Sequence, residues 1–185
     1  MGEAVHIQRI PTDDLQRIRE VDRTELIAAK YEVVRSADGL SLSLVERACD
    51  PPEEFPNWDE EGRVGRREWW QRELAGGGAA FGAFLGERLV GFAVTVTPRR
   101  AAEVLGIFVD AGFRRGGIGG RLLAAAEEYA KDAGAPVVYL HPNLTVAAVG
   151  FYRKHGYALT CLVEEGTLSC PEMETCIVLA KRVGG

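Results

Sequence analysis

The stretch Phe113-Arg114-Arg115-Gly116-Gly117-Ile118-Gly119-Gly120-Arg121-Leu122-Leu123 decides the fold of this chain. It lies between an apolar run at 104–109 and a segment at 118–133 whose apolar residues keep helical spacing. Glycines let the main chain approach a ligand closely and adopt positive φ angles. Unpaired N–H groups at the start of a helix, together with the helix dipole, favour an anion such as pyrophosphate. We therefore predict a strand–loop–helix unit that binds an anionic ligand.

Three other interpretations of this loop are weaker. A Walker loop needs a lysine followed by Ser or Thr after its last glycine, but Arg121 follows Gly120. A dinucleotide fingerprint counted from Gly117 and Gly119 requires a third glycine where Leu122 stands, and it belongs on the first strand of a domain. A glycine-rich connection without chemical importance is the remaining alternative, and the strand–loop–helix setting argues against it.

The rest of the chain predicts alternating strands and helices without internal repeats. Before the loop we expect a strand at 5–10, a helix that opens at Pro11 and Thr12 and reaches Leu26, a strand at 40–45, a polar acidic loop at 50–62, a helix at 64–74, a hairpin of 80–85 with 89–97, and the strand 104–109. After it we expect a helix at 118–133, a strand at 136–141, a helix at 146–155, and strands at 157–163 and 174–181. This order predicts one mixed α/β domain over 1–185.

Three segments resemble the GNAT N-acetyltransferase superfamily. Arg114 to Gly119 is similar to its R/Q-x-x-G-x-G/A signature, and Gly106 to Val109 is similar to its central splayed strand. Phe151-Tyr152-Arg153-Lys154-His155-Gly156-Tyr157 resembles its Y-x-k-x-G-F segment. The matches occur in the right order and cover about the C-terminal half of the chain. The resemblance implies a mixed central sheet of about seven strands with flanking helices, splayed at Val104–Val109.

The resemblance also implies roles for individual residues. The pyrophosphate of acetyl-CoA is expected on the loop amides, and the pantetheine arm on the backbone of the central strand. The residues concerned are Arg114, Arg115, Gly116, Gly117, Ile118, Gly119 and Gly120 in the loop, and Ile107, Phe108 and Val109 in the strand. Tyr152 matches the tyrosine that protonates or hydrogen-bonds the departing CoA thiolate, although a core aromatic is the alternative.

Two assignments stay open. Relatives often place an asparagine seven residues before the tyrosine, where this chain has Thr145, so Asn143 either contacts the pantetheine or caps the following helix. Glu103 is the expected base that deprotonates the amine, His141 is the second candidate, and water is the third. No cysteine is placed as a nucleophile, so we expect direct transfer in a ternary complex.

The acceptor is less constrained. Acidic residues crowd the segment 50–61 around Phe55 and Trp58, which would attract a cationic amine unless the segment is simply a solvated loop. Trp69 and Trp70 cannot share one helix face, so we expect one in the core and the other near a pocket or an interface. The expected acceptor is a primary amine of a small molecule or protein.

Composition limits the other classes. A net charge of −5 argues against a nucleic-acid partner, and no C-x-x-C pair or cysteine–histidine spacing predicts a metal site. Cys49, Cys161, Cys170 and Cys176 are expected to be reduced thiols. The first ten residues lack an apolar signal segment, and Pro136 and Pro142 interrupt the uncharged run 133–152, so we expect a cytoplasmic protein without a membrane span. A catalytically silent acyl-CoA-binding module is the alternative to an enzyme. The resemblance also allows a homodimer.

Overall fold

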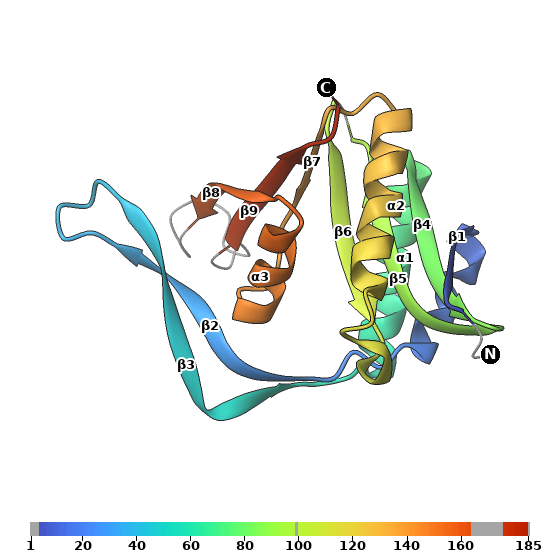
Figure 1. Ribbon diagram of the computed structural model, residues 1–185, viewed down its shortest axis with the longest axis horizontal. Coiled ribbons are helices and arrows are strands. Elements are labelled where there is room, and N and C mark those ends of the chain that lie inside the picture. The colour runs from blue at the N-terminus through green and yellow to red at the C-terminus, as the bar shows by residue number, and fades with distance from the viewer. Residues whose placement is uncertain (1–3, 99, 164–175, 185) are drawn as a thin grey trace. The chain divides into compact units, whose positions relative to one another are not determined.

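The computed structural model describes residues 4–98, 100–163 and 176–184. Seven strands form one sheet in the order β1-β4-β5-β6-β7-β9-β8, and two more form a separate sheet, β2-β3. Within the large sheet, β1 pairs antiparallel with β4, β4 with β5, β5 with β6, and β8 with β9. The fold is therefore the mixed α/β sheet with flanking helices that the sequence predicted (Figure 1).

The chain divides into two compact units that interleave in sequence. The first contains residues up to Glu25, Phe55–Val138 and residues from Arg182, and the second contains Leu26–Glu54 and Tyr139–Lys181. The prediction of one domain stays a prediction. Among the described residues, no helix combines the length and the apolar character needed to cross a membrane.

In the first unit, helices cover both faces of an antiparallel sheet. The strands are β1 (His6–Ile10), β4 (Gly78–Leu85), β5 (Arg88–Val96) and β6 (Ala102–Val109), and the helices are η1 (Thr12–Glu20), α1 (Glu60–Ala75) and α2 (Ile118–Asp132). Ile118 and Leu122 of α2 pack on Val90 and Ala93 of β5 on one face. The residues of η1 and α1 pack on the other face. Each face thus has its own hydrophobic cluster, and Figure 1 shows α1 and α2 on opposite sides of the strands.

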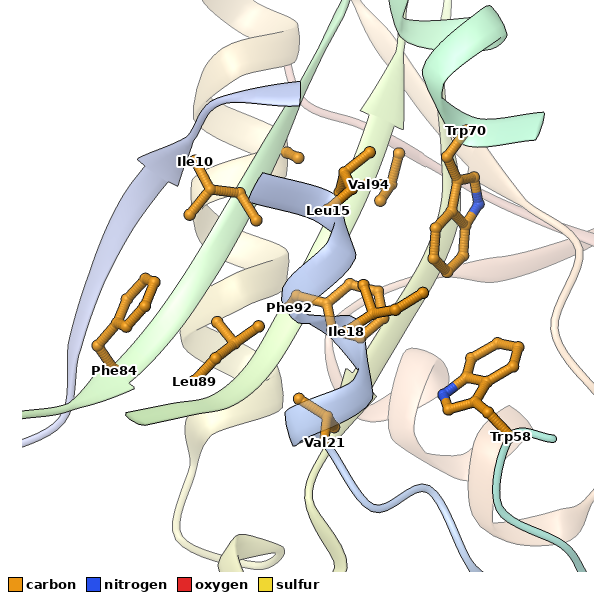
Figure 2. Close-up of a cluster of buried hydrophobic side chains, with 11 residues drawn as sticks. Ile10, Leu15, Ile18, Val21, Trp58, Trp70, Phe84, Leu89, Phe92 and Val94 are labelled. Atoms are coloured by element: carbon orange, nitrogen blue, oxygen red, sulfur yellow. The ribbon is translucent and has the colours of Figure 1, made fainter. Parts of the chain in front are cut away.

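The cluster under η1 and α1 is rich in aromatic side chains (Figure 2). Trp70 is fully buried, with its ring centroid 5.4 Å from Phe92 and 5.9 Å from Phe108. The 3-10 helix η1 contributes Leu15 and Ile18, which are 0% and 1% exposed. Because large apolar side chains supply most of the free energy of burial, this cluster is a main source of stability for the unit.

The second unit contains a long two-stranded ribbon, β2 (Glu25–Arg35) and β3 (Leu42–Phe55), whose ends extend into the first unit by one residue each. It also contains α3 (Val146–Lys154), β8 (Ala158–Val163), β9 (Cys176–Arg182, whose last residue is in the first unit) and the second half of β7 (Val137–Leu140). The main-chain N–H of Tyr31 in β2 donates to the carbonyl of Leu144, 2.7 Å away, just before α3. The ribbon is therefore tied to the start of α3 within this unit.

The ribbon is where the sequence-based prediction was wrong. The predicted first helix does not reach Leu26, because η1 ends at Glu20 and Leu26 is a 68% exposed residue of β2. The predicted acidic loop at 50–62 is instead the end of β3, a short connection and the start of α1. Most residues at the end of β3 are exposed, so the chain shows no buried alternation there, and alternation is the main sequence signal for a strand.

The other predicted elements are present within one to a few residues of the expected bounds. The hairpin turns at Gly86, which has a φ of +56°, so a residue that tolerates positive φ stands where the turn requires one. Helices α2 and α3 lie in the predicted ranges, and α1 begins four residues before the predicted start at Val64 and ends one residue after Leu74. The last strand begins at Cys176 within the described residues, and the predicted start at Glu174 lies outside them.

The exposure of Leu26 tests whether its segment is the observed strand or the predicted helix with a buried face, and the buried Leu122 of α2 serves as the reference. Leu122 is 0% exposed and Leu26 is 68% exposed. Leu122→Ala removes buried methyl groups and leaves a cavity, so it should lower the free energy of unfolding by about 2–5 kcal/mol. Leu26→Ala should change it by less than about 0.5 kcal/mol. Urea unfolding followed by circular dichroism measures both, and a large effect of Leu26→Ala would restore the helix interpretation.

Candidate functional site

The glycine-rich loop connects the end of β6 to the start of α2. After Val109 the chain forms a short 3-10 turn, η2 (Ala111–Phe113), and α2 begins at Ile118. Arg115 and Gly117 have φ angles of +64° and +80°, so the left-handed conformation occurs at two alternate positions. Left-handed residues in such alternation turn successive N–H groups toward one side and form a concave anion site.

The loop leaves hydrogen-bond donors open. Within the part of the chain that the structure describes, the main-chain N–H groups of Gly117, Ile118, Gly119 and Gly120 have no acceptor, and the first N–H bonded in α2 is that of Arg121, 3.2 Å from the carbonyl of Gly117. A Cβ atom added at Gly117 would meet nothing within 4 Å. Four donors at a helix N-terminus beside open space suit an anion, and the binding of a pyrophosphate by this loop stays a prediction.

The side chain of Arg114 ties the loop to two main-chain carbonyls. Its Nε donates to the carbonyl of Val109 at 3.0 Å, and one terminal nitrogen donates to the carbonyl of Thr24 at 2.7 Å. The side chain of Arg114 therefore ties the loop to Val109 and Thr24. The side chain of Arg115 is exposed.

Asp110 is a supporting residue that sequence analysis missed. Its carboxylate is 4% exposed and accepts hydrogen bonds from the N–H groups of Gly112 (3.0 Å) and Asp22 (3.2 Å) and from the Arg88 guanidinium (3.0 Å). The N–H of Ala111 donates to the carbonyl of Asp22, 2.8 Å away. An aspartate directly after an apolar strand, two residues before a glycine, was the available signal.

Strand β6 pairs with β5 on one edge and neighbours β7 on the other in the sheet order. Leu105 is a bulged residue, because the register with β5 changes between the pairs Thr95–Val104 and Val94–Gly106. The N–H of Asp110 donates to Val90 of β5 at 3.0 Å. The main-chain N–H and C=O groups of successive residues in a strand point to alternate edges. Since those of Asp110 face β5, those of Phe108 also face β5, and those of Ile107 and Val109 face away from it. The main-chain groups of Ile107 and Val109 therefore point away from β5, and their use by an extended ligand stays a prediction.

Glu103 lies near the start of β6, paired with Val96 of β5. Its residue is half-buried, and its main-chain carbonyl accepts from the Thr95 hydroxyl at 3.0 Å. Its role as base stays a prediction.

Tyr152 belongs to the second unit and lies on α3. It is 9% exposed, and its ring packs edge-on against Phe151 (4.9 Å) and Tyr157 (5.8 Å). Burial raises the pKa of the Tyr152 phenol, so the side chain stays protonated and able to donate at neutral pH. Its action on a ligand held by the glycine loop stays a prediction.

The start of α3 corrects one expectation. Thr145 caps the helix, since its hydroxyl accepts from the N–H of Ala148 at 3.1 Å, and it is 5% exposed. Asn143, which the sequence allowed as the cap, is exposed two residues earlier. Thr145 is the cap because it immediately precedes the first helical residue, and from that position a side chain reaches the N–H groups of the first turn. The role of Asn143 toward pantetheine stays a prediction.

The remaining candidates differ in environment. His141 is exposed, with its ring 6.1 Å from that of Tyr139. His155 is half-buried, and its Nδ1 lies 2.9 Å from the carbonyl of Phe151. Cys49, Cys161 and Cys176 are free thiols, and Cys170 lies outside the described residues. No group of three or more His, Cys, Asp or Glu residues in the described ranges is arranged to hold a metal ion.

The adjacent arginines test the support of the loop. Arg114→Gln should lower the free energy of unfolding by about 1–3 kcal/mol, because two partly buried carbonyls lose a charged donor. Arg115→Gln is the matched control, and we expect a change within about 0.5 kcal/mol. Chemical denaturation measures both. Equal effects would contradict a supporting role for Arg114.

The Tyr152 phenol should make stability depend on alkaline pH. The unfolded chain releases this proton near pH 10, whereas the folded protein retains it to higher pH because burial raises the pKa of Tyr152. Folding therefore loses up to about 1.4 kcal/mol per pH unit above about pH 10. Tyr152→Phe should show a shallower loss in urea unfolding between pH 9 and 11. Identical slopes for the two proteins would contradict the burial of this phenol.

Comparisons with known proteins agree with this geometry. Residues 44–157 match the model of the acetyltransferase (GNAT) family. The structure resembles nourseothricin acetyltransferase with a TM-score of 0.75 and 22% identity, covering 97% of this chain and 99% of that one. A Bacillus anthracis protein described as a streptothricin acetyltransferase, solved with acetyl coenzyme A, has a TM-score of 0.73 and 22% identity, and the match covers 98% of this chain and 99% of that one. The Escherichia coli ribosomal-protein-S18-alanine N-acetyltransferase has a TM-score of 0.65 and 17% identity, and the match covers 98% of this chain and 96% of that one.

Among curated proteins, none matches the sequence closely enough to count as a relative. The structural likeness, at these identities, establishes the fold, and the family model adds the family over more than half of the chain, from β3 through the glycine loop to Tyr157. The chain belongs to the GNAT family of acetyltransferases.

Proposed function

We propose that the protein transfers the acetyl group of acetyl-CoA to a primary amine of a small molecule or protein, directly and within a ternary complex. The observation that carries the proposal is the row of four open N–H donors at Gly117–Gly120. These donors match the charge and the several oxygen acceptors of a pyrophosphate. Solved structures of similar fold contain acetyl coenzyme A or coenzyme A, which supports this choice of ligand.

The main chain of β6 would hold the pantetheine arm. An extended amide-containing arm can bond to the edge groups of Ile107 and Val109 as an added strand does. The same edge offers an N–H to the thioester oxygen, where negative charge develops when the amine attacks. Asn143 is proposed as a further contact for this arm.

The reaction then forms one bond and breaks one. The neutral amine nitrogen attacks the thioester carbon, and the tetrahedral intermediate collapses with loss of the CoA thiolate. Glu103, His141 or water accepts the proton that the amine loses. Tyr152 is proposed as the donor to the thiolate sulfur. Because burial raises the pKa of Tyr152 above that of a thiol, the phenol is better suited to a hydrogen bond than to complete proton transfer.

The loop predicts how acetyl-CoA binding responds to substitution. Gly117→Glu should weaken binding at least about a hundredfold, because a carboxylate would occupy the anion site and repel the pyrophosphate. Gly134→Glu is the matched control: Gly134 also has a positive φ, +73°, with nothing within 4 Å of an added Cβ, and it lies just beyond the other end of α2. Calorimetry with acetyl-CoA should show near-native affinity for this control. Equal binding by native protein and Gly117→Glu would overturn the loop assignment.

Turnover tests the enzyme against the silent binding module. In a screen of amines with detection of free CoA thiol, Tyr152→Phe should bind acetyl-CoA normally and turn over about 10–100 times more slowly. Binding by the native protein without transfer to any amine would favour the module. Undiminished turnover of Tyr152→Phe would remove this residue from the mechanism.

A further inference from the structure

All three tryptophans of the chain gather in the first unit, on the face of the sheet that η1 and α1 cover. The rings of Trp58 and Trp70 meet edge to face with centroids 6.2 Å apart, and Trp69 lies 6.4 Å from Trp70. Figure 2 shows Trp58 and Trp70 at the end of the cluster farthest from Phe84 and Ile10. We call Trp58, Trp69 and Trp70 the tryptophan cluster.

Two arginines stack on the tryptophan cluster. The guanidinium carbon of Arg23 lies 3.7 Å from the ring centroid of Trp58 and 4.6 Å from that of Phe55. The guanidinium of Arg66 lies 5.1 Å from Trp69 and 5.9 Å from Trp70. Stacking holds a guanidinium in a fixed plane and leaves its N–H groups for a further partner.

Among the described residues, no carboxylate forms an ion pair with Arg23 or with Arg66, whose side chain is exposed. Within the described ranges, the guanidinium groups of Arg23 and Arg66 form no ion pair and no hydrogen bond, although the main-chain N–H of Arg23 donates to Asn57 Oδ1 at 3.4 Å. Desolvation, and then the charge of Arg66, lower the pKa of Arg23. Asp59 acts on Arg23 only through space, because its carboxylate accepts from the N–H of Gly62 at 2.7 Å and caps α1. Two neighbouring cations are therefore left without a bound counter-charge.

The same cluster contains buried donors that lack acceptors. The Nε of Arg23 and the indole nitrogens of Trp58 and Trp70 are fully covered and have no hydrogen-bond partner among the described residues. Trp70 is fully buried and Trp58 is 9% exposed. An unpaired buried donor is unfavourable, so a ligand that supplies acceptors would recover that free energy. All three groups are donors, which favours a ligand group made of acceptors alone.

The tryptophan cluster contacts the proposed reaction strand. Phe108 of β6 lies 5.3 Å from Trp58 and 5.9 Å from Trp70, centroid to centroid. Ile107 and Val109, its neighbours in the strand, pack instead with the residues of α2. The cluster therefore meets β6 on the face opposite to the helix that begins with the glycine loop. An acceptor bound here would lie beside Phe108, in the strand proposed to hold the pantetheine arm.

We propose that Arg23 and Arg66, with the tryptophan cluster, bind a carboxylate of the acceptor, so that the acceptor is an amine that also carries a carboxylate. This inference rests on the proposed acetyl transfer. The alternative expectation, a cationic acceptor attracted by the acidic segment 50–61, fits the structure less well, because several of those acids have partners. Glu53 pairs with Lys30, Glu60 pairs with Arg63 at 2.5 Å, and Asp59 caps α1.

Tryptophan fluorescence tests the proposal without catalysis, because every tryptophan of the chain lies in the cluster. The probes are product-like pairs: N-acetylglycine, N-acetylleucine and Nα-acetyllysine, each against its carboxamide. For the native protein we expect a saturable change in emission, with at least one acid binding about tenfold or more tightly than its amide. Arg23→Gln should abolish that preference, and Arg66→Gln should reduce it.

Arg67→Gln is the matched control, since Arg67 is the next residue along α1 and points about 100° away from Arg66. It should keep the native preference for acids. The proposal is overturned if no pair shows a preference in the native protein, or if the preference persists in both Arg23→Gln and Arg66→Gln. Urea unfolding and acetyl-CoA calorimetry of each variant keep the two proposals separate. Acid discrimination without acetyl-CoA binding would overturn the acetyl transfer alone, and acetyl-CoA binding without acid discrimination would overturn this inference alone.

Discussion

The hydrogen bonds of the Arg114 guanidinium to the carbonyls of Val109 and Thr24 are the constraint on which the ligand loop depends. The loop by itself is unfavourable, since it places a non-glycine residue at positive φ and leaves four N–H groups without acceptors. A left-handed arginine costs on the order of 1–3 kcal/mol. Two charge-assisted bonds contribute about 1.5–3 kcal/mol each and can offset that cost. Asp110 adds a second tie from the same strand end to residue 22. The loop therefore holds its donors ready before any ligand arrives.

Strand β6 connects the two halves of the proposed site through the alternation of its residues. Ile107 and Val109 direct their side chains to the face of α2 and their polar groups away from β5. Phe108 directs its ring to the opposite face and packs against Trp58 and Trp70. A change of one residue in register would exchange these faces. The bulge at Leu105 lies directly before this segment, so the pairing with β5 fixes which residue faces which ligand.

Much of the site was predictable because its signals are local. The glycine spacing, the preceding strand and the helix after it lie within thirty residues, and the structure has the loop where the pattern placed it. Arg23 was not predictable, because its role comes from stacking on Trp58, far along the chain. For Asp110 the sequence offered only the local turn with Gly112, and its bond to Asp22 is equally distant in sequence. The ribbon β2–β3 was missed for a different reason. Its exposed faces remove the alternation that identifies a strand, and its prolines resemble a loop.

The charge of the whole chain is a poor guide to its ligands. A net charge of −5 would suggest a cationic partner, and the acidic segment 50–61 adds to that impression. Yet the described structure pairs Glu53 and Glu60 with basic residues, uses Asp59 as a helix cap, and leaves Arg23 and Arg66 without an acid. What a pocket attracts at contact distance depends on its few desolvated groups, because exposed charges farther away than about 8–10 Å are screened by salt. Both proposed ligand regions of the first unit, the glycine loop and the tryptophan cluster, present donors that have no acceptor among the described residues. In the proposed function, the cofactor's phosphates would satisfy the first region and a carboxylate of the acceptor would satisfy the second.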